Sequence, residues 1–212
     1  MLVDIHTHSP SSNHICIQYS RQPLINDQYH FSAGIHPWDA HLYQDTNLDE
    51  LFSSIFSHKN FFTLGEIGID LIKKENLEMQ KTIFLQQLKL AKESQIKIIL
   101  IHCVKSLNEI LKLLKESQYS GQVIFHDANF NTIETELIIN MGHFLSFGNN
   151  LFKDNSKAQQ TIHSKWIKHY FFETDDSKRN IQDVYQQACS VMGISMNFLE
   201  EQTLKNFHRI NQ

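Results

Sequence analysis

The 212-residue sequence is poor in the residues that cross-link small secreted proteins or form linkers. It contains three cysteines, three prolines and seven glycines. The cysteines Cys16, Cys103 and Cys189 are odd in number and widely spaced, which predicts neither a disulfide framework nor a CxxC zinc site. We therefore expect reduced thiols and a cytoplasmic protein. Because no linker, repeat or low-complexity run interrupts the chain, we expect a single domain over residues 1–212.

Long apolar runs and excess basic charge are also missing. The longest apolar stretch, around residues 96–101, is far shorter than the ~20 residues that cross a bilayer. The first residues have neither the basic nor the apolar region of a signal peptide, so we expect no membrane association. The formal net charge of −4 argues against coating of nucleic acid by bulk electrostatics, although a local basic patch stays compatible with it. No GxGxxG or GxxxxGK[ST] loop occurs, which argues against Rossmann and P-loop domains.

Short apolar runs alternate with longer segments of helical period along most of the chain. Several runs are continuously apolar, as expected for strands that are buried on both faces of a parallel sheet. Alternating strands and helices predict βα units, and eight candidate strands favour a closed barrel over an open sheet. The expected strands are residues 2–6, 15–19, 30–34, 61–66, 96–102, 122–126, 144–147 and 170–175.

The chain is short for such a barrel, which typically has ~250 residues. Only residues 7–14 separate the first two expected strands. We therefore predict a compact α/β fold, a TIM-type (β/α)₈ barrel whose helix between strands one and two is missing or reduced. Helical stripes are expected over residues 48–56, 79–91, 107–114 and 181–192. Ser106 and Glu109 suggest a capping box, and Asn131 and Ser195 suggest two further helix starts.

Potential metal ligands stand at the ends of the expected strands. The sharpest signal is Asp4-Ile5-His6-Thr7-His8, where alternation puts His6 and His8 on one side of an extended strand. A surface histidine pair would explain this motif alone, but ligand types recur at four other strand ends. Since the carboxyl ends of barrel strands converge on one mouth, we expect the six side chains to meet there. They are His6, His8, Glu66, His102, His126 and Asp175.

Mixed imidazole and carboxylate ligands suit zinc, manganese, iron or cobalt, and carboxylates with waters can hold magnesium. The residues alone therefore predict metal-assisted hydrolysis. Asp175 could both bind a metal and accept the proton of the attacking water. His36 is a candidate substrate or phosphate contact, or else a turn histidine before a proline. Glu173 and Asp70 are expected behind metal-bound histidines, which usually need a hydrogen-bond acceptor.

The motifs resemble those of the TatD family of metal-dependent hydrolases, within the wider amidohydrolase-like barrel group. They occur in the family's order across nearly the whole chain. The matching segments are DIHTH at 4–8, GIHPW at 34–38, GEIGID at 65–70, IH at 101–102, FH at 125–126, ETD at 173–175 and KNFHRI at 205–210.

The resemblance implies a two-metal site. One ion would be held by His6, His8, Glu66 and Asp175, and the second by Glu66, His102 and His126, with Glu66 bridging. Asp175 and Glu66 would be the catalytic residues and His36 a substrate-binding residue. The implied cofactors are two divalent ions (Mg, Zn or Mn). The implied activity is that of a deoxyribonuclease, with DNA or a small phosphoester as substrate, and we expect a monomer.

The sequence departs from the family's pattern near the expected mouth. The usual proline after ETD is replaced by Asp176-Ser177-Lys178-Arg179, and an HCFSG-like stretch by His126-Asp127-Ala128-Asn129. All six ligand positions survive, so the substrate is less defined than the metals. The alternatives are a hydrolase of a small phosphoester, amide or ester, and a catalytically idle binding protein. A basic cluster at the mouth would favour nucleic acid; its candidates are Lys105, Lys153, Lys178 and Arg179.

Overall fold

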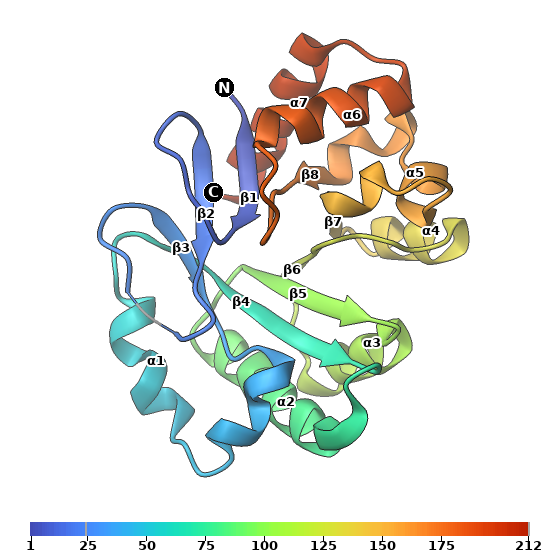
Figure 1. Cartoon of the computed structure of the whole chain (residues 1–212). Coiled ribbons are helices and arrows are strands. Elements are labelled where there is room, and N and C mark those ends of the chain that lie inside the picture. Colours follow the sequence, from blue (N-terminus) through green and yellow to red (C-terminus); the bar gives the residue numbers. More distant parts are fainter. Residues whose placement is uncertain (24, 212) are drawn as a thin grey trace. The chain divides into compact units, whose positions relative to one another are not determined.

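Eight strands form the frame of the chain in the computed structural model, which describes residues 1–23 and 25–211 (Figure 1). The strands follow one another in chain order, and the paired strands run parallel. The end of the last strand pairs with the first through a parallel bridge between Thr7 and Asp175. The predicted TIM-type (β/α)₈ barrel is therefore confirmed. The strands are β1 (Val3–Thr7), β2 (Ile15–Tyr19), β3 (His30–Ala33), β4 (Phe61–Asp70), β5 (Ile98–Val104), β6 (Gln122–Phe125), β7 (Phe144–Phe147) and β8 (Tyr170–Phe172).

The expected helices are all present, and short 3₁₀ turns supplement them. No helix lies between β1 and β2, as predicted, and none lies between β2 and β3 among the described residues there. Within the described ranges, no helix is both long enough and apolar enough to cross a bilayer. The helices are η1 (Pro37–Tyr43), α1 (Leu48–Phe56), η2 (Lys74–Asn76), α2 (Leu77–Glu93), α3 (Leu107–Ser117), α4 (Thr132–Asn140), η3 (Asn149–Phe152), α5 (Lys157–Thr161), η4 (Ser164–His169), α6 (Ile181–Met192) and α7 (Met196–Ile210).

The contacts between residues divide the chain into two units. Unit 1 consists of Met1–Gln18 and Ile124–Gln212, and unit 2 of Tyr19–Val123. Unit 1 contains β1, β7 and β8, unit 2 contains β3, β4 and β5, and the boundaries fall within β2 and β6. Each unit is described by itself below, and the single domain over residues 1–212 stays a prediction.

In unit 1, the two C-terminal helices fix the strands that carry site residues. Tyr185 of α6 is fully buried, and its hydroxyl donates to the carbonyl of Val3 and accepts from the Val3 amide, at 3.0 and 3.2 Å. Asn206 of α7 donates to the carbonyls of Ile167 and Tyr170, both at 2.9 Å. A buried amide or hydroxyl must find such partners. These bonds therefore set the positions of β1 and β8.

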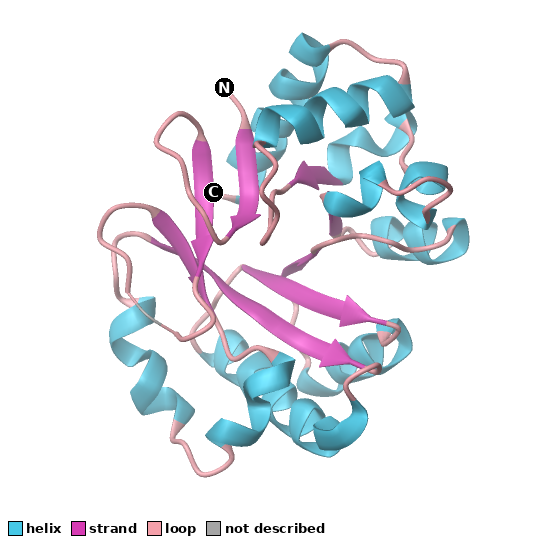
Figure 2. Ribbon diagram, in the orientation of Figure 1, coloured by secondary structure: helices cyan, strands magenta, loops and turns pink. Residues whose placement is uncertain are grey.

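In unit 2, the long strand β4 lies beside β5, and α2 lies along β4 (Figure 2). Gly68 pairs with His102 and has φ of +147°. A Cβ atom at this position would collide with the carbonyl oxygen of His102, so only glycine fits here. Gln87 of α2 accepts from the Ile35 amide at 2.7 Å and donates to the Ile35 carbonyl at 3.2 Å. These bonds anchor the segment that leads to His36.

The capping box predicted at Ser106 is wrong. Its hydroxyl is buried and donates to the carbonyl of Ile69 at 2.6 Å, and no side chain caps the start of α3. A buried carbonyl in a neighbouring strand competes successfully for the hydroxyl. The predicted caps at Asn131 and Ser195 are confirmed, and Asn131 forms a full capping box with Glu134.

Candidate functional site

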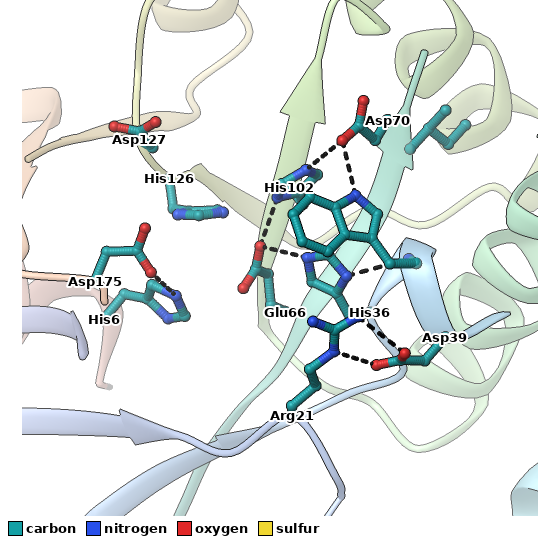
Figure 3. Close-up of polar contacts among 12 residues, drawn as sticks. His6, Arg21, His36, Asp39, Glu66, Asp70, His102, His126, Asp127 and Asp175 are labelled. Atoms are coloured by element: carbon teal, nitrogen blue, oxygen red, sulfur yellow. Dashed lines mark hydrogen bonds and ion pairs between the residues drawn. The ribbon is translucent and has the colours of Figure 1, made fainter. Parts of the chain in front are cut away.

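In unit 1, main-chain pairing brings Asp175 to the end of β1. The His8 amide donates to the Asp175 carbonyl, and the Asp175 amide donates to the His6 carbonyl, both at 3.0 Å. The Asp175 side chain then lies between two imidazoles, with Oδ1 at 3.3 Å from Nε2 of His6 (Figure 3) and 3.5 Å from Nε2 of His8. One ligand atom from each residue lies within 4.8 Å of the others. Two imidazoles and a carboxylate at this spacing fit a divalent transition metal.

Asp175 combines an unusual backbone conformation with a charged side chain. Its φ is +53°, a left-handed conformation that costs free energy for a residue with a side chain and that is common at functional sites. Burial raises the pKa of Asp175, but the interactions with His6 and His8 outweigh it and hold the pKa well below its usual range. The side chain is therefore an ionised carboxylate at neutral pH.

A second group in unit 1 combines His126 and Glu173 with Asp175. Oε1 of Glu173 lies 3.2 Å from Nδ1 of His126 and accepts from the amide of Asp127 at 2.7 Å. Glu173 is completely buried, and its Oε2 has no hydrogen-bond partner among the described residues. A buried carboxylate oxygen without a donor is costly. This group therefore also fits a cation, and Glu173 contacts the His126 ring; its support of a metal-bound histidine stays a prediction.

Asp4 stabilises the segment after β8 that carries Glu173 and Asp175. Thr174 donates to Asp4 through its amide at 3.0 Å and through its hydroxyl at 2.7 Å. Burial raises the pKa of Asp4 to about 7. Since Thr174 lies between Glu173 and Asp175, these bonds fix the two carboxylates that flank it. The sequence showed Asp4 only as the first residue of the HxH strand, so this role was missed.

In unit 2, the candidate ligands surround Glu66, which is buried on β4. Its Oε1 lies 2.6 Å from Nδ1 of His102 and 3.2 Å from Nε2 of His36 (Figure 3). The centroids of the two imidazole rings are 4.7 Å apart. One ligand atom from each of the three residues lies within 4.8 Å of the others, so they too could hold a cation. His36, expected at the substrate, thus lies beside two expected ligands.

Asp70 and Trp38 contact the two histidines of this group on the side away from Glu66. Asp70 accepts from the indole N–H of Trp38 at 2.8 Å, and the same oxygen lies 3.6 Å from Nε2 of His102. Burial raises the pKa of Asp70, but the interactions with His102 and Trp38 outweigh it and keep the pKa well below its usual range. Nδ1 of His36 accepts from the Trp38 amide at 3.1 Å, which directs Nε2 towards Glu66. Burial lowers the pKa of His36, so this ring is neutral at pH 7.

Within each unit, the candidate ligands that were predicted from the ends of the strands lie close together. Unit 1 gathers His6, His8, His126 and Asp175, and unit 2 gathers Glu66 and His102 with His36. The six-residue ligand set and the bridging role of Glu66 stay predictions.

Two further residues of interest were not predicted from the sequence. The sequence left Trp38 between packing and stacking on a base, and it did not show that Trp38 donates to Asp70 and to His36. Asp127 is the second. Burial raises its pKa to about 7, and its Oδ1 accepts from Asn150 at 2.8 Å. Asn150 in turn accepts from Lys153 at 2.8 Å. In the sequence, Asp127 was visible only as a departure from the family's pattern.

Comparison with known sequences identifies relatives of the chain. The sequence model of the family described as TatD related DNase matches residues 2–212. An uncharacterized metal-dependent hydrolase from Buchnera aphidicola subsp. Baizongia pistaciae (strain Bp) is 26% identical over 149 residues. That alignment covers 68% of this chain and 54% of the relative, so the chain spans about half the length of the curated relative that it matches.

Solved structures share the fold at low identity. YJJV, a TatD homolog from Escherichia coli K12, superposes with a TM-score of 0.86 at 18% identity, covering 99% of this chain and 97% of that one. A TatD family hydrolase from Entamoeba histolytica gives 0.81 at 18% identity with the same coverage. An uncharacterized amidohydrolase from Saccharomyces cerevisiae gives 0.66 at 14% identity, covering 86% of this chain and 80% of that one. At these identities the likeness shows the fold alone.

Proposed function

Because the chain belongs to the family of TatD-related DNases, we propose that it is a metal-dependent hydrolase that cleaves phosphodiester bonds, with DNA as its substrate class. The observation that carries the proposal is Asp175, an ionised carboxylate between two imidazoles. The relative described as a metal-dependent hydrolase supports the same chemistry.

The side chains of the candidate groups fit divalent metal ions. His6, His8 and Asp175 form one set in unit 1, and Glu66 and His102 form another in unit 2. The buried Glu173 beside His126 adds negative charge that a cation would compensate. When bound, divalent ions polarise a phosphoryl oxygen and lower the pKa of water from about 15.7 towards about 7. We propose two such ions, of magnesium, zinc or manganese, on the six residues His6, His8, Glu66, His102, His126 and Asp175.

The protein's own side chains then supply proton transfer and orientation. Asp175 places a carboxylate oxygen beside His6 and His8, where it can accept the proton of the attacking water. Glu66 holds His36 and His102 in one orientation, at 3.2 and 2.6 Å. His36 is neutral and buried, and because its Nδ1 accepts from Trp38, its one N–H is on Nε2 and faces Glu66; a phosphoryl oxygen placed beside Glu66 can accept from this N–H. Fixed donors of this kind stabilise the charge that develops during displacement.

Hydrolysis of a small phosphoester, amide or ester is the alternative, because the loop after His126 carries the half-buried Asp127 and differs from the family's pattern. The test uses purified protein that is stripped with EDTA and reloaded with magnesium, manganese or zinc. Single-stranded DNA, bis(p-nitrophenyl) phosphate and a panel of N-acyl amides serve as substrates.

We expect metal-dependent cleavage of DNA and of the generic phosphodiester. The same change is made at two neighbouring aspartates. Asp175→Asn should be inactive, whereas the control Asp176→Asn, at an exposed position, should be active. Cleavage of amides alone would replace the phosphodiesterase proposal with the alternative. Cleavage that EDTA leaves unaffected would contradict metal dependence.

A further inference from the structure

Unit 2 contains a cavity of about 250 Å³ that lies beside, and not within, the group around Glu66. Two basic side chains, one acidic side chain and an indole line it, together with two amides. These residues are Arg21, Trp38, Lys73, Glu75, Asn76 and Gln80. We call it the Trp38 cavity.

The indole of Trp38 is rigidly held and partly open to solvent. Its N–H is bound to Asp70, and its main-chain amide is bound to the His36 ring. The residue is nevertheless 39% exposed. The indole centroid lies 4.9 Å from that of His36 and 6.1 Å from that of His102. Because the indole N–H is already bonded to Asp70, the exposed part of the Trp38 ring can stack with a flat ring of a ligand. The indole also contacts His36, which belongs to the group around Glu66.

Two cations converge on this indole. The Arg21 guanidinium carbon lies 5.1 Å and the Lys73 ammonium nitrogen 5.3 Å from the ring centroid. Arg21 is oriented by a two-point contact with Asp39, at 2.6 and 3.0 Å (Figure 3). In the part of the chain that the structure describes, no carboxylate forms an ion pair with Lys73. Its charge is therefore available to an anion.

The loop that carries Lys73 is built in place. The Lys73 amide donates to Asp70 at 3.3 Å, and its carbonyl accepts from Gln80 at 2.6 Å. Oε1 of Gln80 accepts from the Asp70 amide at 2.9 Å. Gln80 therefore clamps the loop at both ends, and Asp70 links the same loop to Trp38. A cation carried by an anchored loop beside a fixed aromatic surface is a preorganised arrangement, which reduces the entropic cost of binding.

We propose that the Trp38 cavity binds one nucleotide unit of the substrate, next to the unit that is cleaved. The base or sugar lies on the Trp38 indole, and the phosphate is held by Lys73 and Arg21. Stacking on an aromatic side chain and contact of phosphate with basic side chains are the two usual components of single-strand binding. This assignment rests on the proposed function and narrows its substrate to an oligonucleotide.

Binding is tested without catalysis. The chain has two tryptophans, so in a Trp166→Phe background the fluorescence reports on Trp38 alone. In EDTA, this protein is titrated with thymidine 5′-monophosphate, thymidine and inorganic phosphate. We expect the nucleotide to change Trp38 fluorescence and to bind at least about tenfold more tightly than either part, since both contacts are then made.

Neighbouring lysines provide a matched pair of variants. Lys73→Glu should weaken nucleotide binding about tenfold or more, because it reverses a charge beside the phosphate. Lys74→Glu makes the same charge change at the adjacent residue, which does not line the cavity, and should stay within about twofold of the parent. Arg21→Ala should also weaken binding, and it keeps the test decisive if Lys73→Glu misfolds. In the metal-loaded enzyme, Lys73→Glu should raise KM for an oligonucleotide more than it lowers kcat.

Different results would overturn the nucleotide site and the hydrolase activity. If Trp38 fluorescence does not respond, or if Lys73→Glu and Lys74→Glu bind the nucleotide equally, the Trp38 cavity is not a nucleotide subsite, even if DNA is cleaved. If the nucleotide binds as expected and no phosphodiester is cleaved, the subsite stands and the proposed hydrolase activity falls.

Discussion

Unit 1 orients its candidate ligands mainly through the main chain, whereas unit 2 orients them through other side chains. In unit 1, amide–carbonyl bonds between β1 and the end of β8 set Asp175 against His6 and His8. In unit 2, Glu66 collects two imidazoles, and Asp70 and Trp38 hold those imidazoles from outside. A main-chain arrangement tolerates changes in the residues around it. A side-chain arrangement depends on each of its members.

The largest loss of activity is expected for a change at Asp175, which contacts His6 and His8 in unit 1. Asp175→Asn keeps the shape but removes a metal-binding charge and the proposed proton acceptor. General-base assistance alone is worth about 10²–10⁴-fold, so we expect activity to fall to background and the metal content to decrease. Metal analysis beside DNA hydrolysis measures both. Full activity in a metal-loaded Asp175→Asn protein would rule out this role.

The next effect concerns the outer layer of unit 2. Asp70→Asn removes the charge that faces His102 and weakens the acceptor of the Trp38 N–H. Loss of such a supporting group typically lowers metal affinity by about 10–100-fold. Competition with a chelator measures that affinity, and Asp49→Asn, at an exposed position of α1, is the control. Unchanged affinity would mean that Glu66 and the backbone alone orient His102.

A smaller effect is expected for His36. It contacts Glu66 but lies outside the six proposed ligands, so His36→Ala should keep its metals and lose affinity or moderate rate, about tenfold for a lost hydrogen bond to a charged group. His41→Ala, an exposed histidine of η1, should change neither quantity. Loss of metal from a folded His36→Ala protein would instead make His36 a ligand, as its place in the group around Glu66 would allow.

The smallest effect is on stability and depends on pH. Burial, with a further contribution from His169, lowers the pKa of His143 in unit 1 from 6.5 to about 4. Between these values the unfolded chain binds a proton that the folded chain does not, so His143 makes the free energy of unfolding fall as pH falls from about 6.5 to about 4. In His143→Gln this contribution disappears, and urea unfolding should depend less on pH. His208→Gln, at an exposed position, should follow the parent; equal slopes in all three proteins would contradict the shift.

The sequence indicated the candidate ligands more clearly than the side chains that support them. His6, Glu66, His102 and Asp175 were visible because each follows an apolar run, and parallel strands bring their carboxyl ends to one edge. The contact of Trp38 with Asp70 joins residues 32 positions apart and depends on the path of the segment after β3, which carries Trp38. No local pattern encodes that path.

Local signals also failed where a tertiary partner competes. Ser106 and Glu109 have the spacing of a capping box, yet the Ser106 hydroxyl bonds to Ile69 in β4. Asn131 and Glu134 have the same spacing and do form the box, because the Asn131 side chain lies at an exposed helix start. Burial at the first position decides between the two outcomes, and the sequence does not report it.

Each unit is proposed to contribute side chains that bind metal, and metal stoichiometry tests this most directly. The protein is stripped with EDTA and dialysed against manganese or zinc, and the bound metal per chain is then measured for the parent, His8→Ala and His102→Ala. We predict two ions in the parent and one fewer in each variant, because the histidines belong to different groups of ligands. A parent that binds no metal, or two variants that both keep the full complement, would contradict the account.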